Sequence, residues 1–241
     1  MFILGLLGLS AGAAELQKLA VISVLGDSVA VVTHRPEVGS QIDRNQRDAF
    51  ELAPATVDNI AVGAVADAIK RMGKLGTAQV VLLAAPGGQS GANWFEGDRF
   101  TPPAELRAAL TATDATHLLL VTRLRASTGL KTSHGSTGSG HLEGLGFYLD
   151  HNKKMSRSDT GERGQGFLAV YAYLKLTLID VSTGAVEREQ RVTASRTFSA
   201  ARNTEGTDPW GALDATQKMA AMRGLIRTEL VLTVPKLLAA P

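Results

Sequence analysis

Two long alternating segments in the second half of the chain constrain its fold more than any other feature. Residues 166–182 (GFLAVYAYLKLTLIDVS) alternate apolar side chains with polar or tyrosine ones, and residues 185–199 form a second such segment after the turn sequence Ser182-Thr183-Gly184. A period of two is typical of strands with one dry face and one wetter face. The sequence therefore predicts a long antiparallel hairpin, and with it a sheet that can hold two long strands.

The rest of the chain alternates predicted helices with predicted strands. Apolar residues at helical spacing indicate helices, and continuous apolar runs are typical of central strands that are buried on both faces. In chain order we expect a hairpin at 19–33 with its turn at Gly26-Asp27, a helix at 56–72, a strand at 78–85, a helix at 103–113, a strand at 117–124 and a last helix opened by Asp208-Pro209. This order predicts an α/β (α+β) fold, with a mixed sheet of about five to seven strands and helices packed on it.

The amino-terminal residues predict export from the cytoplasm. Residues 1–14 (MFILGLLGLSAGAA) carry no charged side chain, and their apolar run ends in Ala11-Gly12-Ala13, which fits the A-x-A cleavage pattern of a secretory signal peptide. The run is shorter than the roughly 20 residues that a spanning helix needs. A buried amino-terminal strand or helix is the alternative. We therefore expect a signal peptide at 1–14, a single mature domain at 15–241, and a periplasmic or secreted protein.

Composition narrows the classes of protein to which the chain can belong. Hydrophobic residues make up 44% of its 241 residues, which is enough for a sizeable core. It has no cysteine, which excludes a disulfide scaffold, a thiolate zinc site and a cysteine nucleophile. The formal net charge is +2, and like charges form no block of the kind found in nucleic-acid-binding segments. We therefore expect neither a nucleic-acid partner nor a cofactor.

An unusual segment at about 126–166 joins two predicted strands through a stretch rich in Gly, Ser and Thr. Connections of this length are uncommon inside compact domains and tend to be functional or disordered. Its short apolar island contains Phe147 and Tyr148. One interpretation is a flexible insertion, and the other is an extended hairpin that presents Phe147 and Tyr148 to a protein partner or a membrane surface. On the second interpretation, replacing 130–163 by a short turn leaves folding intact and abolishes partner capture.

A serine esterase is the alternative that the sequence leaves open. Gly26-Asp27-Ser28 after a predicted strand resembles the first block of GDSL or SGNH esterases, and Asp114 and His117 match a D-x-x-H pair. The resemblance implies a triad of Ser28, Asp114 and His117, which must lie within hydrogen-bond reach to act. In that family, however, D-x-x-H lies near the carboxyl end, and the G-x-N-D block is absent here. A hairpin turn explains the same residues, so catalysis is not our leading interpretation.

Two further patterns are interpreted as ordinary loops. The glycine-rich residues 87–91 follow a predicted strand, as a phosphate-binding loop does, but G-K-[ST] is missing. Structural zinc sites show tighter ligand spacing than the histidines have here, so we expect no metal site. The histidines are His34, His117, His134, His141 and His151.

The order of the predicted elements resembles the periplasmic α/β domain of curli-secretion channel (CsgG-like) proteins and the amino-terminal domain of TolB. Three local features carry this resemblance: residues 19–24 (LAVISV), 106–121 (LRAALTATDATHLLLV) and 174–185 (LKLTLIDVSTGA). The resemblance implies an envelope-associated, non-catalytic protein that works through partners. The channel family also has a lipidated cysteine and two membrane hairpins, whereas this chain has no cysteine and one long insertion.

Together these observations predict an exported binding or assembly module of the cell envelope without catalytic activity. Its expected partner is an envelope protein or a second copy of the chain, and a membrane surface is the alternative partner. Phe147 and Tyr148 are the expected binding residues, while Ser28, Asp114 and His117 carry the alternative esterase hypothesis.

Overall fold

The fold is built around one mixed sheet with helices on it. The structure is a computed structural model that describes residues 18–36, 43–73, 79–82, 91–132, 135–156, 161, 163–202 and 208–239. In this part of the chain nine strands form the sheet: β1 (Lys18–Ser23), β2 (Ser28–Thr33), β3 (Gln46–Glu51), β4 (Gln79–Leu82), β7 (His117–Arg123), β8 (Arg125–Ser127), β11 (His141–Ser156), β12 (Arg163–Asp180) and β13 (Val186–Ser199). The α-helices are α1 (Thr56–Arg71), α2 (Ala104–Ala112) and α3 (Ala215–Leu238). Two short hairpins are separate, β5 (Phe95–Glu96) with β6 (Arg99–Phe100) and β9 (Leu130–Thr132) with β10 (Gly135–Thr137). The α/β class with a mixed sheet is therefore confirmed, with nine strands instead of about five to seven.

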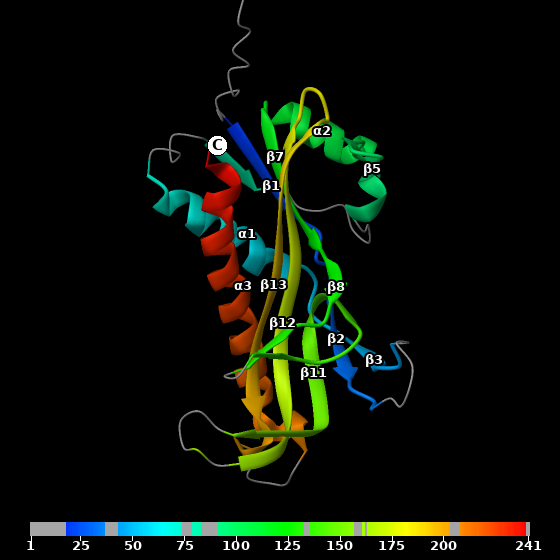
Figure 1. Ribbon diagram of the computed structural model, residues 1–241. Helices are drawn as coiled ribbons and strands as arrows, with labels where there is room; N and C mark the ends of the chain where they lie inside the picture. Colours follow the sequence, from blue (N-terminus) through cyan, green and yellow to red (C-terminus); the bar gives the residue numbers. More distant parts are fainter. Residues whose placement is uncertain are drawn as a thin grey trace, which may run out of the picture.

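β12 is the centre of the sheet. Along one edge it pairs antiparallel with β13 from Phe167 to Ile179, which confirms the long predicted hairpin. Two strands pair with its other edge, one after the other. β11 pairs with the first part of β12, from Arg163 to Tyr173, and β7 pairs with the last part, from Leu174 to Asp180. The sheet therefore forks into one branch of β7, β1 and β4 and another of β11, β2 and β3 (Figure 1).

The predicted hairpin at 19–33 is wrong, because β1 and β2 belong to different branches. β1 lies parallel between β7 and β4, whereas β2 lies between β11 and β3. The connection between them is held by the start of α1. The Asp58 carboxylate accepts hydrogen bonds from Ser23 Oγ (2.5 Å) and from the Gly26 backbone N–H (3.3 Å), and Asp27 Oδ1 accepts one from the Ala55 N–H (2.7 Å). The Gly-Asp pair therefore serves a crossing between branches rather than a tight hairpin turn.

Helices α1 and α3 cover one face of the sheet (Figure 1). α1 follows its prediction closely, but α3 begins later than expected. Asp208 caps a short 3-10 turn, Pro209–Ala212, and α3 is capped instead by Asp214, which forms a capping box with Gln217. In the described part of the chain, no helix is long and apolar enough to cross a membrane.

The other face is covered in two parts. Over β1 and β7 lie α2 and the β5–β6 hairpin, with Trp94 and Phe100 in the core. On β11 and β12, Leu130 of β9 and Leu142 from the start of β11 form one buried cluster with the three tyrosines, Tyr148, Tyr171 and Tyr173. The predicted insertion at 126–166 is therefore, in its described residues, part of the fold: β11 lies inside the sheet and pairs with β2, β8 and β12.

Candidate functional site

The structure separates the residues of the alternative esterase triad. Ser28 begins β2, where its Oγ is 3.5 Å from Nη2 of Arg123, the last residue of β7. His117 is the first residue of β7, so it lies about 20 Å from that end at roughly 3.3 Å per strand residue. The His117 imidazole instead contacts Thr116 Oγ1 at 3.0 Å. His117 therefore cannot act as the general base for Ser28, and the hypothesis of an esterase triad is wrong.

The expected binding residues Phe147 and Tyr148 lie in the core, on opposite faces of β11. Phe147 is 4% exposed and packs in the cluster under α1 and α3, whereas Tyr148 is fully buried on the other face. The Tyr148 ring stacks on Phe167, and its hydroxyl accepts a hydrogen bond from the Ser139 N–H (3.2 Å). Burial raises the pKa of the Tyr148 phenol above its ordinary value. The expectation that these two rings are presented at the surface is therefore wrong, because β11 is an internal strand.

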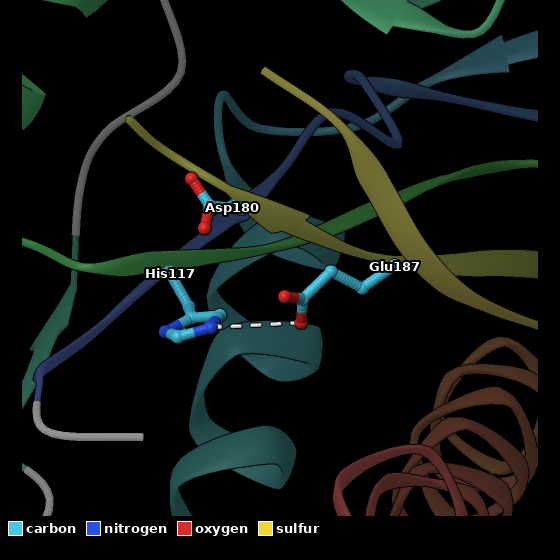
Figure 2. Close-up of side chains that lie close together, drawn as sticks. All are labelled: His117, Asp180 and Glu187. Carbon is cyan, nitrogen blue, oxygen red and sulfur yellow. Dashed lines mark ion pairs between the residues drawn. The ribbon is translucent and has the colours of Figure 1, made fainter. Parts of the chain in front are cut away.

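Three possible metal ligands meet where β7, β12 and β13 lie side by side. His117 opens β7, Asp180 closes β12 directly opposite it, and Glu187 is the second residue of β13. The register between β12 and β13 shifts between Leu178 and Ile179, and this β-bulge leaves Glu187 without a residue opposite it. One ligand atom from each of the three side chains lies within 4.8 Å of the other two. Figure 2 shows the imidazole and the Glu187 carboxylate pointing toward each other. His117 Nε2 and Glu187 Oε2 are 3.5 Å apart.

The three side chains of this cluster, His117, Asp180 and Glu187, differ in burial and in what holds them. The His117 side chain is 3% exposed, whereas that of Glu187 is 32% exposed. Asp180 Oδ1 accepts hydrogen bonds from Ser182 Oγ (2.6 Å) and the Thr183 N–H (2.8 Å). The hydrogen bond from Ser182, aided by that from Thr183 and opposed by burial, lowers the pKa of Asp180 below its ordinary value. The cluster therefore offers an imidazole nitrogen and two carboxylates to a cation.

A second feature is the outer edge of β3, where two aromatic rings lie beside an open strand. All six residues of β3 are exposed, and among the described strands it pairs with β2 alone. Phe50 is 51% exposed and stacks on Trp210 with the ring centroids 6.0 Å apart. Trp210 rests edge-on against Phe147 at 5.5 Å, and Lys218 Nζ lies 3.9 Å from the Trp210 ring centroid. We call β3 with Phe50 and Trp210 the β3 edge site.

The sequence alone predicted neither the His117–Asp180–Glu187 cluster nor the β3 edge site, because the residues of each are distant in sequence and only the fold brings them together. The ligands of the cluster are distant in sequence, and only the register of three neighbouring strands brings them together. The signal that was present is a histidine at the start of one apolar strand and an aspartate at the end of another. Pairing those strands antiparallel would have placed His117 opposite Asp180, but the bulge that adds Glu187 has no sequence signature. Likewise, nothing in the sequence pairs Phe50 with Trp210.

Comparisons with known proteins give structural similarity at low scores. No family model matches the sequence, and no curated protein matches it significantly. A Xanthomonas campestris protein of family DUF330 is 11% identical, with a TM-score of 0.38 over 90% of this chain and 81% of the other. A putative neuraminyllactose-binding hemagglutinin homolog from Helicobacter pylori is 7% identical, with a TM-score of 0.41 over 92% and 86%. The PelC dodecamer from Paraburkholderia phytofirmans is 15% identical, with a TM-score of 0.30 over 93% and 89%. At these scores the similarities assign no activity or partner to this chain.

Proposed function

We propose that this protein is an exported, non-catalytic binding or assembly module of the cell envelope that acts through a protein partner. The observation that carries the proposal is the β3 edge site, where the exposed Phe50 stacks on the half-buried Trp210 beside a strand edge that no other described strand pairs with. The β3 edge site replaces Phe147 and Tyr148 as the surface that we expect to bind the partner. Phe147 contributes from beneath, because Trp210 packs on it.

The chemistry of the β3 edge site suits an extended segment of a partner. An edge strand has backbone N–H and C=O groups that a further strand can pair with, and strand addition of this kind is a recurring mode of peptide recognition. Phe and Trp are enriched at the centre of protein interfaces, where they lose contact with water. The charged residues Arg47, Asp48 and Glu51 of β3 suit the polar rim of such an interface. The expected occupant is therefore an extended protein segment with an apolar side chain over Phe50.

Export is supported by the amino-terminal sequence and by the resemblance to periplasmic domains. Residues 1–14 lie outside the described residues, so the signal peptide remains a sequence prediction. The resemblance to domains of curli-secretion channel proteins and of TolB is likewise an inference from the sequence, and it supports the proposed export. Intact-mass measurement of the protein recovered from the cell envelope tests it: the mature chain is expected to begin at about residue 15. Recovery of the uncleaved chain from the cytoplasm would contradict export.

Site-specific photocrosslinking in cells tests the binding surface. A photoreactive phenylalanine in place of Phe50 is expected to give a discrete crosslinked species, because this ring lies in the proposed interface. Leu232 is the matched control, since it is 55% exposed on α3 and lies outside the β3 edge site. The same probe at Leu232 is expected to give no such species.

The mass of the crosslinked species separates the two kinds of partner. A mass twice that of the chain indicates self-assembly, whereas another mass indicates an envelope protein. Substituting Phe50→Ser is expected to abolish the interaction, as measured by co-purification from detergent-solubilised envelopes. Equal crosslinking from Phe50 and Leu232, or none from either, would overturn the proposal.

A further inference from the structure

We infer that His117, Asp180 and Glu187 form a binding site for a divalent transition-metal ion, for which Zn²⁺ is the probe. The inference goes beyond the proposed function, because these residues lie on β7, β12 and β13 and not in the β3 edge site. It rests on the meeting of three ligand atoms from three strands within 4.8 Å of one another.

The donor set selects the class of ion. Zn²⁺ binds imidazole nitrogen at about 2.0–2.1 Å and carboxylate oxygen at about 2.0–2.2 Å. Ca²⁺ and Mg²⁺ prefer sites made of oxygen atoms alone, so the imidazole of His117 favours a transition metal. Two ligands of a tetrahedral ion at these bond lengths are about 3.4 Å apart. The 3.5 Å between His117 Nε2 and Glu187 Oε2 already matches that spacing.

Two of the three ligands are held in place by neighbouring groups. The His117 ring is buried, and its Nδ1 contacts Thr116 Oγ1 at 3.0 Å, which leaves Nε2 facing the cluster. Thr116 Oγ1 in turn donates to the Lys18 carbonyl (3.0 Å), so the ring is anchored to the β1–β7 pair. A histidine ligand whose second nitrogen has a fixed partner is the usual arrangement in metal sites. For Asp180, the bonds from Ser182 Oγ and the Thr183 N–H to Oδ1 hold the carboxylate in place.

The third ligand, Glu187, is the one that can move to complete the coordination of the ion. Glu187 is about one-third exposed, and the bulge frees it from a cross-strand partner. Its carboxylate can therefore shift toward an ion that His117 and Asp180 hold. A bound dication also offsets the charge of two neighbouring carboxylates. Three protein ligands leave a further position for water, as in open zinc sites.

Zinc titration of the purified, chelator-stripped protein tests the site. A competition assay with a chromogenic chelator is expected to give one Zn²⁺ per wild-type chain, and Mg²⁺ in large excess is expected not to displace it. The variant Glu187→Gln keeps the size of the side chain but weakens its bond to the metal, and we expect a loss of affinity of at least about tenfold. The matched control is Glu189→Gln, since Glu189 is also on β13 but forms ion pairs with Lys175 and Arg191. It is expected to bind Zn²⁺ as the wild type does.

Thermal unfolding gives a second readout that does not depend on the chelator. Because an ion that binds only the folded state stabilises it, Zn²⁺ is expected to raise the Tm of the wild type and of Glu189→Gln, and to raise that of Glu187→Gln by less at the same Zn²⁺ concentration. If Glu187→Gln does not fold, Asp180→Asn takes its place in both assays. Equal zinc affinity in wild type and Glu187→Gln, displacement by Mg²⁺, or no stoichiometric binding would overturn the inference. None of these results bears on crosslinking from Phe50, so the two proposals fail independently.

Discussion

Tyr171 and Tyr173 are both buried on the same face of β12, but only the Tyr173 hydroxyl has a hydrogen-bond partner in the part of the chain that the structure describes. Tyr173 Oη accepts a hydrogen bond from the Gly129 N–H (3.0 Å), whereas Tyr171 Oη has no hydrogen-bond partner among the described residues. Removing a satisfied buried hydroxyl costs stability, while removing an unsatisfied one does not. We therefore expect Tyr173→Phe to lower the free energy of unfolding by about 1 kcal/mol, and Tyr171→Phe to leave it unchanged or raise it. Urea unfolding checks both, and the reverse order would contradict the hydrogen-bond assignment.

Gly146 shows how closely the two strands beside it approach. A Cβ at this position would lie 2.2 Å from the Ala30 carbonyl oxygen and 2.6 Å from Tyr171 Oη. Gly146→Ala is therefore expected to lower the free energy of unfolding by about 1–3 kcal/mol, because a backbone atom must move. The control is Gly224→Ala in α3, where a Cβ meets nothing within 4 Å. It is expected to raise the free energy of unfolding by about 1 kcal/mol through helix propensity. Urea unfolding of the two variants, followed by circular dichroism, makes the comparison.

Among the elements, the turn between β12 and β13 makes stability depend on pH. The pKa of Asp180 lies below its ordinary value of 3.8, first because of the hydrogen bond from Ser182. A lowered pKa in the folded state means that the unfolded chain binds a proton more readily. The contribution of Asp180 is therefore complete above pH 4 to 5, and it is lost as the pH falls through the lower, folded-state pKa. In metal-free buffer, Asp180→Asn is expected to destabilise the protein at pH 7 but much less at pH 2.5. An equal effect at both values would contradict this account.

Elements with a strong local pattern could be predicted, whereas pairings between strands distant in sequence could not. The helix at 56–72 and the β12–β13 hairpin follow from periodicity, because one buried face dictates each pattern. The 19–33 segment has the pattern of two strands, yet the pattern does not say whether they pair with each other. Whether the two strands pair depends on contacts outside the segment: Asp58 of α1 accepts a hydrogen bond from Ser23, β1 pairs with β7, and β2 pairs with β11. The glycines of β11 made that strand resemble a loop, although Gly146 is required by close packing.

At the scale of the whole molecule, β11 holds one branch of the sheet to β12. It pairs with β2 on one edge and β12 on the other, and β3 is attached through β2. Replacing residues 130–163 by a short turn, which the sequence had suggested to be harmless, is now expected to prevent folding. The shortened chain should show no cooperative thermal transition by circular dichroism, whereas the full chain should show one. A cooperative transition in both would contradict the central place of β11.

The forked sheet also sets the order in which the chain can fold. β1 is made first, but its neighbours β4 and β7 come later, and β2 can pair early with β3 but meets its other neighbour, β11, only much later. Pairings between such distant segments are slow, because the intervening loop must close before any contact stabilises it. A chain leaving the ribosome therefore cannot join β1 and β2 into one sheet until β12, which links the two branches, has been synthesised. The export proposed above would draw on this delay, because the sheet stays incomplete for an interval in which the chain can be transported.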